Sequence, residues 1–304
     1  MKRLYITGSG GFVGQHIVRL VAEGAYGDCE VVAGAQGLDI RNQEAVLEDI
    51  ERCRPDWVLH LAAQSFVPES FVNPAHTFDV NLGGTLSLLE GLKKASFGGR
   101  VLYVSSGDVY GAVAERELPV KETQLPAPRN PYAVSKVAAE LLCRQRYFSD
   151  GLDVIIARPF NHIGPGQGTQ FVVPGLASQV ARVVSGLQEP VITVGSIDVS
   201  RDFSDVRDIA RAYAALFRSG QPGEIYNVCS GKEVKIAEVL DRLCQLAGVV
   251  VDIRQDDTRV RPNEQRRMVA SAEKLTRDTG WTPERSLDDS LAEILKNFEM
   301  KGVR

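Results

Sequence analysis

A short apolar run, Leu4-Tyr5-Ile6-Thr7, leads directly into the glycine-rich stretch Gly8-Ser9-Gly10-Gly11-Phe12-Val13-Gly14. Four residues are too few for a helix, so the run predicts a buried strand, and a helical pattern follows to about residue 23. A glycine loop between a strand and a helix brings backbone N–H groups and a helix N-terminus up to a pyrophosphate. The start of the chain therefore predicts a dinucleotide-binding unit.

Further strands and helices alternate along the chain. Buried-strand patterns lie at 30–33, 57–61, 101–104, 154–157 and 225–228, with helical patterns at 42–53, 77–94 and 206–218. This alternation predicts an α/β fold with a Rossmann-type doubly wound parallel sheet. The pattern loosens after residue 163, where we expect a smaller α/β substrate-binding lobe towards the C-terminal side.

The 304 residues allow a nucleotide-binding domain with a lobe grown out of it. We expect residues 1–163 and about 200–230 to form the NADP(H)-binding domain. We expect residues 164–199 and about 231–304 to form the substrate lobe. A surface loop is expected between residues 115 and 131, which are rich in proline and charge.

Composition argues against several classes of protein. A net charge of -4 without a basic stripe argues against a nucleic-acid partner. No run approaches the roughly 20 apolar residues of a membrane span, and the N-terminus has no signal-peptide pattern. The five cysteines form no C-x-x-C pair, which favours reduced, structural thiols and a cytoplasmic location; they are Cys29, Cys53, Cys143, Cys229 and Cys244. No metal is assigned.

Tyr132 and Lys136 are four residues apart in a helical segment, so they project from one face. A lysine beside a phenol favours the phenolate and brings the pKa of the tyrosine closer to working pH, as suits a general acid or base. Ser105 and Ser106 follow a strand, at the edge where open α/β sheets bind ligands. The pair alone also allows a packed Tyr132 and a solvated Lys136.

Small residues follow the strand at 57–61, and they let a cofactor lie close to the backbone. We therefore place Leu61, Ala62, Ala63 and Gln64 beside the nicotinamide ribose. We expect His60 to be a core histidine with satisfied hydrogen bonds rather than a catalyst. The next segment, 65–69, would overhang the active site.

The end of the second strand, residues 34–36, lacks the acidic residue that binds an adenosine ribose 2′-hydroxyl and repels a 2′-phosphate. NADP(H) is therefore the preferred cofactor, and NAD(H) stays open. Arg41 is the nearest cation for the phosphate, although it also suits a solvated position at a helix start. Asn42 then caps a helix.

Many motifs recur in a fixed order over nearly the whole chain. They are Thr7 to Gly14, His60-Leu61-Ala62-Ala63, Asn81-x-x-Gly84-Thr85, Ser105-Ser106-x-x-Val109-Tyr110-Gly111, Tyr132-x-x-x-Lys136, Arg158-x-Phe160-Asn161, Arg201-Asp202-Phe203-x-x-Val206-x-Asp208, Arg261-Pro262-x-Glu264 and Gly280-Trp281-x-Pro283. On these motifs the chain resembles the extended short-chain dehydrogenase/reductases, in the branch that modifies nucleotide sugars.

The resemblance implies roles for individual residues. It implies catalysis by Ser106, Tyr132 and Lys136. It implies a cofactor site made of Gly8, Gly11, Phe12, Val13, Gly14, Asp39, Ile40, Leu61, Ala62, Ala63, Gln64, Tyr132 and Lys136, with Asp39 facing the adenine. It implies a sugar-nucleotide site made of Ser65, Val67, Glu69, Ser105, Asn161, Val172, Arg201, Arg261 and Glu264. Each arginine also suits a surface ion pair, and Asp39 a turn.

Within that branch the chain most resembles enzymes that reduce the C4 keto group of GDP-4-keto-6-deoxy-D-mannose to GDP-6-deoxy-D-mannose (GDP-D-rhamnose). The nearest alternative is a GDP-mannose 4,6-dehydratase, which uses a glutamate where this chain has Asp108. A ketoreductase or epimerase for another nucleotide sugar and a non-catalytic cofactor sensor also stay open. The resemblance further implies a homodimer joined through a four-helix bundle.

Overall fold

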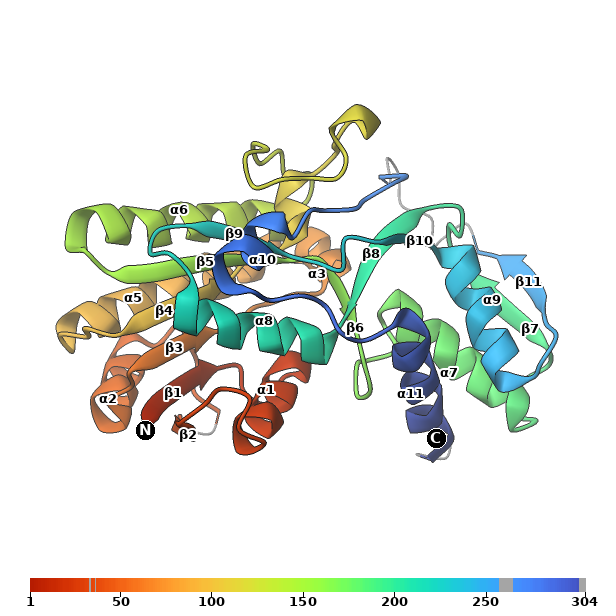
Figure 1. Ribbon diagram of the computed structural model, residues 1–304, viewed down its shortest axis with the longest axis horizontal. Helices are drawn as coiled ribbons and strands as arrows, with labels where there is room; N and C mark the ends of the chain where they lie inside the picture. Colours follow the sequence, from red (N-terminus) through yellow and green to blue (C-terminus); the bar gives the residue numbers. More distant parts are fainter. Residues whose placement is uncertain (33, 36, 257–264, 301–304) are drawn as a thin grey trace.

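The computed structural model describes residues 1–32, 34–35, 37–256 and 265–300. The larger part of the chain is built on one sheet flanked by helices, and a smaller group of helices lies to its side (Figure 1). Within the described residues, no helix combines the length and the apolar character that a membrane span requires.

The main sheet is parallel, with the strand order β2-β1-β3-β4-β5-β9. The chain leaves β1 for β2 on one side and returns to β3 on the other, so the order reverses beside β1. Ligands bind at such a switch point, outside the carboxyl ends of the strands. The predicted Rossmann-type fold is confirmed. The strands are β1 (Lys2–Thr7), β2 (Cys29–Val32), β3 (Trp57–His60), β4 (Arg100–Val104), β5 (Asp153–Pro159) and β9 (Ile225–Val228).

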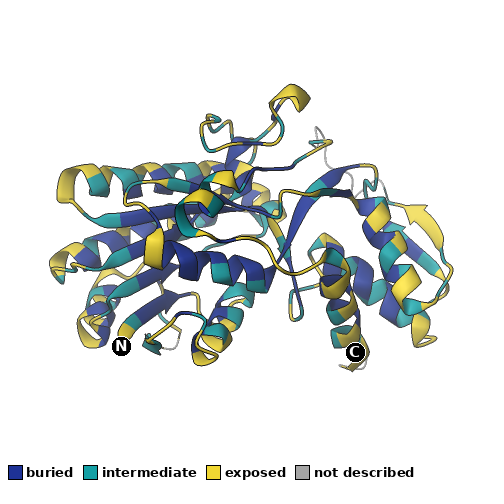
Figure 2. Cartoon of the chain, viewed as in Figure 1, coloured by how far each residue is buried: buried dark blue, intermediate teal, exposed yellow. Residues whose placement is uncertain are grey.

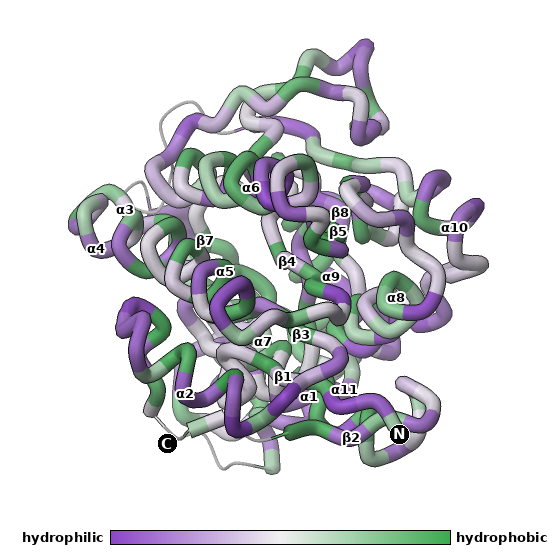
Figure 3. Tube along the Cα trace, turned by 90° about the vertical axis from the view of Figure 1, so that its left-hand side faces the viewer, coloured by the Kyte–Doolittle hydropathy of each residue, from purple (hydrophilic) through white to green (hydrophobic). Residues whose placement is uncertain are grey.

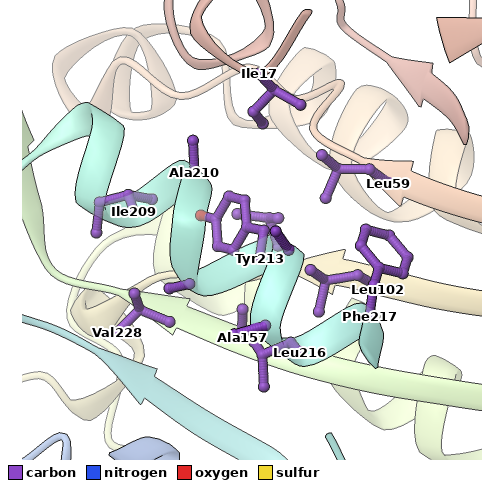
Figure 4. Close-up of a cluster of buried hydrophobic side chains, with 14 of the residues drawn as sticks. Ile17, Leu59, Leu102, Ala157, Ile209, Ala210, Tyr213, Leu216, Phe217 and Val228 are labelled. Atoms are coloured by element: carbon purple, nitrogen blue, oxygen red, sulfur yellow. The ribbon is translucent and has the colours of Figure 1, made fainter. Parts of the chain in front are cut away.

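Both faces of the sheet are buried because successive side chains of each strand alternate between them. On β1, Leu4 and Ile6 pack into one hydrophobic cluster, while Tyr5 packs into a second cluster on the opposite face. Figure 4 shows other residues of the first cluster, among them Ile17 of α1 and Tyr213 of α8. The first face is covered by α1 (Phe12–Ala22), α8 (Val206–Ser219) and α10 (Glu273–Thr279). The second face is covered by α2 (Gln43–Cys53), α5 (Gly84–Lys94) and α6 (Pro131–Asp150), and Figure 3 shows the two helical layers on either side of the strands.

The smaller part has its own hydrophobic core, formed where three helices pack on one another. These are α7 (Val172–Val184), α9 (Ile236–Ala247) and α11 (Leu287–Met300), beside the parallel pair β7 (Val191–Val194) and β11 (Asp252–Gln255). Every residue of β11 is exposed (Figure 2). A separate sheet, β10-β8-β6, is formed by β6 (Asn161–Ile163), β8 (Ser200–Asp205) and β10 (Glu233–Lys235).

Two local expectations are confirmed only in part. The helix expected at 77–94 is three consecutive pieces: α4 (Pro74–Phe78), the π-helical turn η1 (Asp79–Gly83) and α5. The expected surface loop at 115–131 is anchored at Val120, which is fully buried. The Val120 N–H donates to the Val269 carbonyl, and the Val120 carbonyl accepts from the Ser271 N–H. The remaining short helices are α3 (Val67–Val72), η2 (Gly107–Tyr110) and η3 (Glu115–Glu117).

The division into two lobes stays a prediction at its boundaries. As expected, α8 and β9 return to the main sheet. In contrast, β8 lies in the three-stranded sheet, although residues from about 200 onward were assigned to the cofactor domain.

Candidate active site

The glycine loop between β1 and α1 is closely packed at two of its glycines. Gly8 has a φ of +76°, and a Cβ there would lie 2.9 Å from the Ala62 nitrogen. A Cβ on Gly14 would lie 2.6 Å from the carbonyl oxygens of Gly8 and Ser9. Only glycine fits these positions, so the loop lies close against the end of β3, and the Gly11 N–H closes it by donating to the Gly8 carbonyl at 3.0 Å.

The start of α1 suits an anion. Gly11 occupies the N-cap position in an extended conformation, and no side chain caps the helix. The first turn carries no acidic residue, so the partial positive charge of the helix terminus is not compensated there. Phe12 and Val13 are the first helical residues. These features fit the pyrophosphate of a dinucleotide.

His60, at the end of β3, is enclosed by two threonines. Its Nδ1 lies 2.7 Å from Thr7 Oγ1 and its Nε2 lies 3.0 Å from Thr85 Oγ1. Thr85 donates its proton to the Asn81 carbonyl, so Nε2 carries the proton and Nδ1 accepts from Thr7. Burial, with a smaller effect of Lys136, lowers the pKa of His60 to about 3, so the ring is neutral. His60 is therefore the core histidine that the sequence predicted.

Asn81 joins the end of β3 to the helix that carries Tyr132. Its Oδ1 accepts from the Gln64 N–H at 2.8 Å, and its Nδ2 donates to the Gln64 carbonyl at 3.0 Å and to Ser135 Oγ at 2.9 Å. Ser135 in turn donates to the Tyr132 carbonyl at 2.7 Å. Sequence reasoning did not assign a site role to Asn81 or Ser135, although the motif Asn81-x-x-Gly84-Thr85 marked the first of them.

Ser106, Tyr132 and Lys136 converge at the carboxyl end of β4. Ser106 caps the short helix η2 by accepting from the Asp108 N–H at 3.1 Å, and its side chain acts to lower the pKa of Tyr132. Tyr132 is the second residue of α6, and Lys136 follows one turn later on the same face. The Lys136 ammonium donates to the Val104 carbonyl at 2.9 Å and lies 6.0 Å from the centroid of the Tyr132 ring.

The charge states of this pair differ from the sequence-based expectation. Burial raises the pKa of Tyr132 well above its ordinary value and Asp108 adds to the effect, while the Ser106 side chain opposes it. The pKa of Tyr132 is therefore not lowered as expected, because burial has the largest effect and the Lys136 ammonium donates to the Val104 carbonyl. Burial lowers the pKa of Lys136 to about 8, and Glu140 offsets part of that effect. Near neutral pH, Tyr132 is a phenol and Lys136 is mostly charged.

Asp39 and Arg41 bind each other at the edge of the predicted adenosine site. Arg41 donates to both carboxylate oxygens, with an Nη2–Oδ2 distance of 2.7 Å. The side-chain hydrogen bonds from Arg41 lower the pKa of Asp39 to about 2. The cation expected to meet a 2′-phosphate is therefore already paired. Ile40 is buried and packs against Gly84, where a Cβ would lie 2.5 Å from Ile40 Cγ2.

The predicted sugar-nucleotide residues come from several elements. Val67 begins α3 and Val172 begins α7, and the two helix starts meet where the rings of Phe66 and Phe171 are 6.2 Å apart. Ser65 is exposed and Glu69 is half-buried in the same region.

Three further residues of this predicted site lie in other parts of the chain, outside α3 and α7. Asn161 is exposed on β6, where it pairs with Phe203 of β8. Arg201 on β8 donates to the carbonyls of Ser200 and Gln265, at 2.8 Å each. Ser105 is buried, and its Oγ has no hydrogen-bond partner among the described residues. Arg261 and Glu264 lie outside the described residues.

Among the described residues, no group of three or more His, Cys, Asp or Glu side chains is placed to hold a metal ion.

The sequence matches the family described as "GDP-mannose 4,6 dehydratase" over residues 34–294, which is most of the chain. The chain belongs to this family. Its members and relatives are nucleotide-sugar enzymes of the short-chain dehydrogenase/reductase type, so the predicted family and enzyme class are confirmed.

Within and around this family, individual relatives are similar over the whole chain. GDP-6-deoxy-D-mannose reductase of Pseudomonas aeruginosa is 48% identical over 300 residues, covering 99% of this chain and 98% of that protein. GDP-6-deoxy-D-talose 4-dehydrogenase of Aggregatibacter actinomycetemcomitans is 29% identical over 90% of each chain. A solved structure of RMD from Pseudomonas aeruginosa complexed with NADPH superposes with a TM-score of 0.94 at 46% identity, covering 99% of this chain and 100% of that one.

The packing of the glycine loop predicts a difference between two of its glycines. Gly14→Ala places a methyl group against two carbonyl oxygens and should destabilise the cofactor-free protein by about 1–3 kcal/mol, the usual cost of overpacking. Gly10→Ala is the matched control, since its Cβ would have no neighbour within 4 Å. Thermal unfolding of the two variants and of the native protein measures the difference in stability. Equal melting temperatures would contradict the assigned loop packing.

The position of Tyr132 predicts loss of chemistry without loss of binding. Tyr132→Phe removes the acidic proton and should lower kcat at least about 100-fold, because general acids contribute 10²–10⁴-fold. NADPH affinity, measured by fluorescence titration, should change little. Tyr147→Phe is the control on the same helix, since Tyr147 lies at the other end of α6 beside Phe148. Near-normal turnover of Tyr132→Phe would remove Tyr132 from the catalytic role.

Proposed function

We propose that this protein reduces the C4 keto group of GDP-4-keto-6-deoxy-D-mannose to GDP-6-deoxy-D-mannose, with NADPH as reductant. The similarity that carries the proposal is the 48% identity, over almost the full length of both chains, to a GDP-6-deoxy-D-mannose reductase. The similarity to a structure complexed with NADPH supports the cofactor. Other similar structures hold NAD, so NADH is the alternative to test.

The proposed division of labour follows from the charge states of the site. NADPH, when bound, supplies a hydride to the C4 carbonyl carbon. Tyr132, neutral because it is buried, gives its phenolic proton to the oxygen as negative charge develops there. Lys136 then stabilises the resulting phenolate. The Ser106 hydroxyl donates to the same oxygen, a contribution of about 2.7–4 kcal/mol in comparable sites.

The remaining candidate residues hold the two ligands. For the cofactor we propose the glycine loop at Gly8, Gly11 and Gly14, together with the 61–64 segment that Asn81 fixes. For the sugar nucleotide we propose Arg201 and, outside the described residues, Arg261 and Glu264. Arginine suits a diphosphate because its planar fork bonds two oxygens at once.

Dehydration of GDP-mannose is the second candidate, since the family takes its description from that activity. A dehydratase must also remove a proton from C5, for which such enzymes use a glutamate immediately before the V/L-Y-G sequence. This chain has Asp108 there, which is one methylene shorter, and its backbone N–H is bound to Ser106 Oγ. The reductase is therefore favoured, because reduction needs only a hydride and one proton.

A direct assay separates these activities. Purified protein incubated with GDP-4-keto-6-deoxy-D-mannose and NADPH should oxidise one NADPH for each sugar reduced, and NADH should be a poorer reductant. The H4–H5 coupling in the NMR spectrum of the product should be large, as in the manno epimer, and not small, as in the talo epimer. Conversion of GDP-mannose to a keto sugar without NADPH consumption would instead identify a dehydratase. No turnover of either sugar would favour a cofactor sensor.

We further propose that the protein is a homodimer, joined through α5 and α6 in a four-helix bundle, and that it works in the cytoplasm. Three exposed apolar residues, Val134, Leu141 and Phe148, recur every seven positions along α6, and Leu86 is exposed on the neighbouring α5. Such spacing lines up one apolar stripe on a helix. All five cysteines are free, which supports a reducing compartment.

The apolar stripe predicts the effect of charging it. Leu141→Glu combined with Phe148→Glu should convert the dimer to a monomer of about 33.2 kDa, measured by light scattering. The reason is that two carboxylates would have to be buried without partners. Val250→Glu is the control, because Val250 is a more exposed apolar residue outside α5 and α6. A dimer that persists in the double variant would exclude this interface.

A further inference from the structure

A buried ion pair involves the residue one helical turn beyond Lys136 on α6. Glu140 follows Lys136 by one turn of α6, and its carboxylate accepts two hydrogen bonds from Arg158 of β5, at 2.9 Å from Nε and 2.5 Å from Nη2. The exposed fractions are 4% for Lys136, 3% for Glu140 and 2% for Arg158. All three charged side chains are therefore shielded from solvent. A buried pair of this kind adds little to stability on its own, so its presence calls for another reason.

Arg158 is held from its other side as well. Its guanidinium carbon lies 4.8 Å from the centroid of the Tyr110 ring. Tyr110 is fixed in turn, because its hydroxyl donates to Asn227 Oδ1 at 2.6 Å. Although burial opposes it, the bonds to Glu140 raise the pKa of Arg158 above its ordinary value, so the guanidinium keeps its charge. Arg158 thus fixes the position of the Glu140 carboxylate.

Most other titratable groups around Lys136 are neutral near pH 7. Burial raises the pKa of Tyr132 and Cys143 on α6 and of Tyr103 on β4, whose ring centroid is 5.2 Å from the Lys136 ammonium. His60 on β3 has a pKa of about 3. Asp108 acts on Tyr132 from the end of β4. Glu140 is the carboxylate that opposes the effect of burial on Lys136.

We propose that Glu140 is a positioning residue for the reduction: it supplies a buried negative charge beside Lys136, while Arg158 binds the Glu140 carboxylate from β5. Lys136 must be an ammonium ion to stabilise the phenolate that Tyr132 leaves behind. Without Glu140, burial would drive the proton off Lys136. This inference rests on the proposed reduction, in which Lys136 acts as the stabilising cation.

The test is the alkaline limb of the pH profile of kcat/KM for the keto sugar. In the native protein, activity should fall as pH rises through about 8, because Lys136 then loses its proton. Glu140→Gln should move this limb down by about one pH unit or more, which is about a tenfold loss on the alkaline side with little change at pH 6. Glu140→Asp, which keeps the carboxylate, should restore the native limb in large part.

Arg158 provides the discriminating comparison. Arg158→Met breaks the same ion pair but leaves the carboxylate, so its alkaline limb should stay at or above the native position. A purely structural role for the pair would instead impair both single variants alike, without moving the limb. The matched control is Glu90→Gln, which breaks the ion pair of Glu90 with Arg146, three turns further along α6, and should leave the limb unchanged.

Two further measurements test the inference even if the single variants do not fold or lose activity for other reasons. If the single variants do not fold, Glu140→Gln combined with Arg158→Met removes both buried charges and should fold, and its limb should lie below the native one. In the cofactor-free protein, NMR titration of the labelled Lys136 side chain should give a lower pKa in Glu140→Gln than in the native chain. An unchanged Lys136 pKa would overturn the inference. Failure of the native protein to reduce the keto sugar would instead contradict the proposed function.

Discussion

The arrangement of the site depends on one hydrogen bond, from the buried Lys136 ammonium to the Val104 carbonyl. That bond joins α6 to the last residue of β4, directly before Ser105 and Ser106. Because Tyr132 lies one turn before Lys136 on the same helix, fixing the lysine also brings the tyrosine to Ser106. An ammonium without water needs such an acceptor and a nearby anion, and Val104 and Glu140 provide them.

The second constraint is the close packing at the carboxyl ends of β1 and β3. Gly8 approaches the Ala62 nitrogen so closely that no side chain fits between them, and Thr7 accepts the Ala62 N–H. From there the hydrogen bonds continue through Asn81 and Ser135 to the backbone of Tyr132. The end of β1, the start of the segment after β3 and the catalytic helix are thus joined by one polar network. Such networks hold a geometry more strictly than apolar packing does.

Much of this fold could be predicted from the sequence because its central strands are short apolar runs separated by amphipathic helices. The glycine loop and the Tyr132–Lys136 pair were also recognisable, since their chemistry depends on spacing. The strand β8 was not, because its sequence Ser-Arg-Asp-Phe-Ser-Asp reads as polar although nearly all of it is buried. Its burial is possible only through distant partners, such as Ser230 and Gly231 for Asp202. The same limit explains Val120 and the π-helical turn at 79–83, which depend on tertiary contacts.

The charge state of Tyr132 could not be predicted either, because it depends on burial and on the direction of the Lys136 side chain. The protonation state of Tyr132 matters for the direction of the reaction. A reductase needs a protonated phenol before hydride arrives, whereas oxidation of an alcohol needs a phenolate. With the pKa of Tyr132 raised and that of Lys136 at about 8, the free protein at neutral pH holds both in the proton-bearing form. Glu140 opposes the effect of burial on the pKa of Lys136, and the protonated phenol of Tyr132 suits the site to donate a proton to a keto sugar.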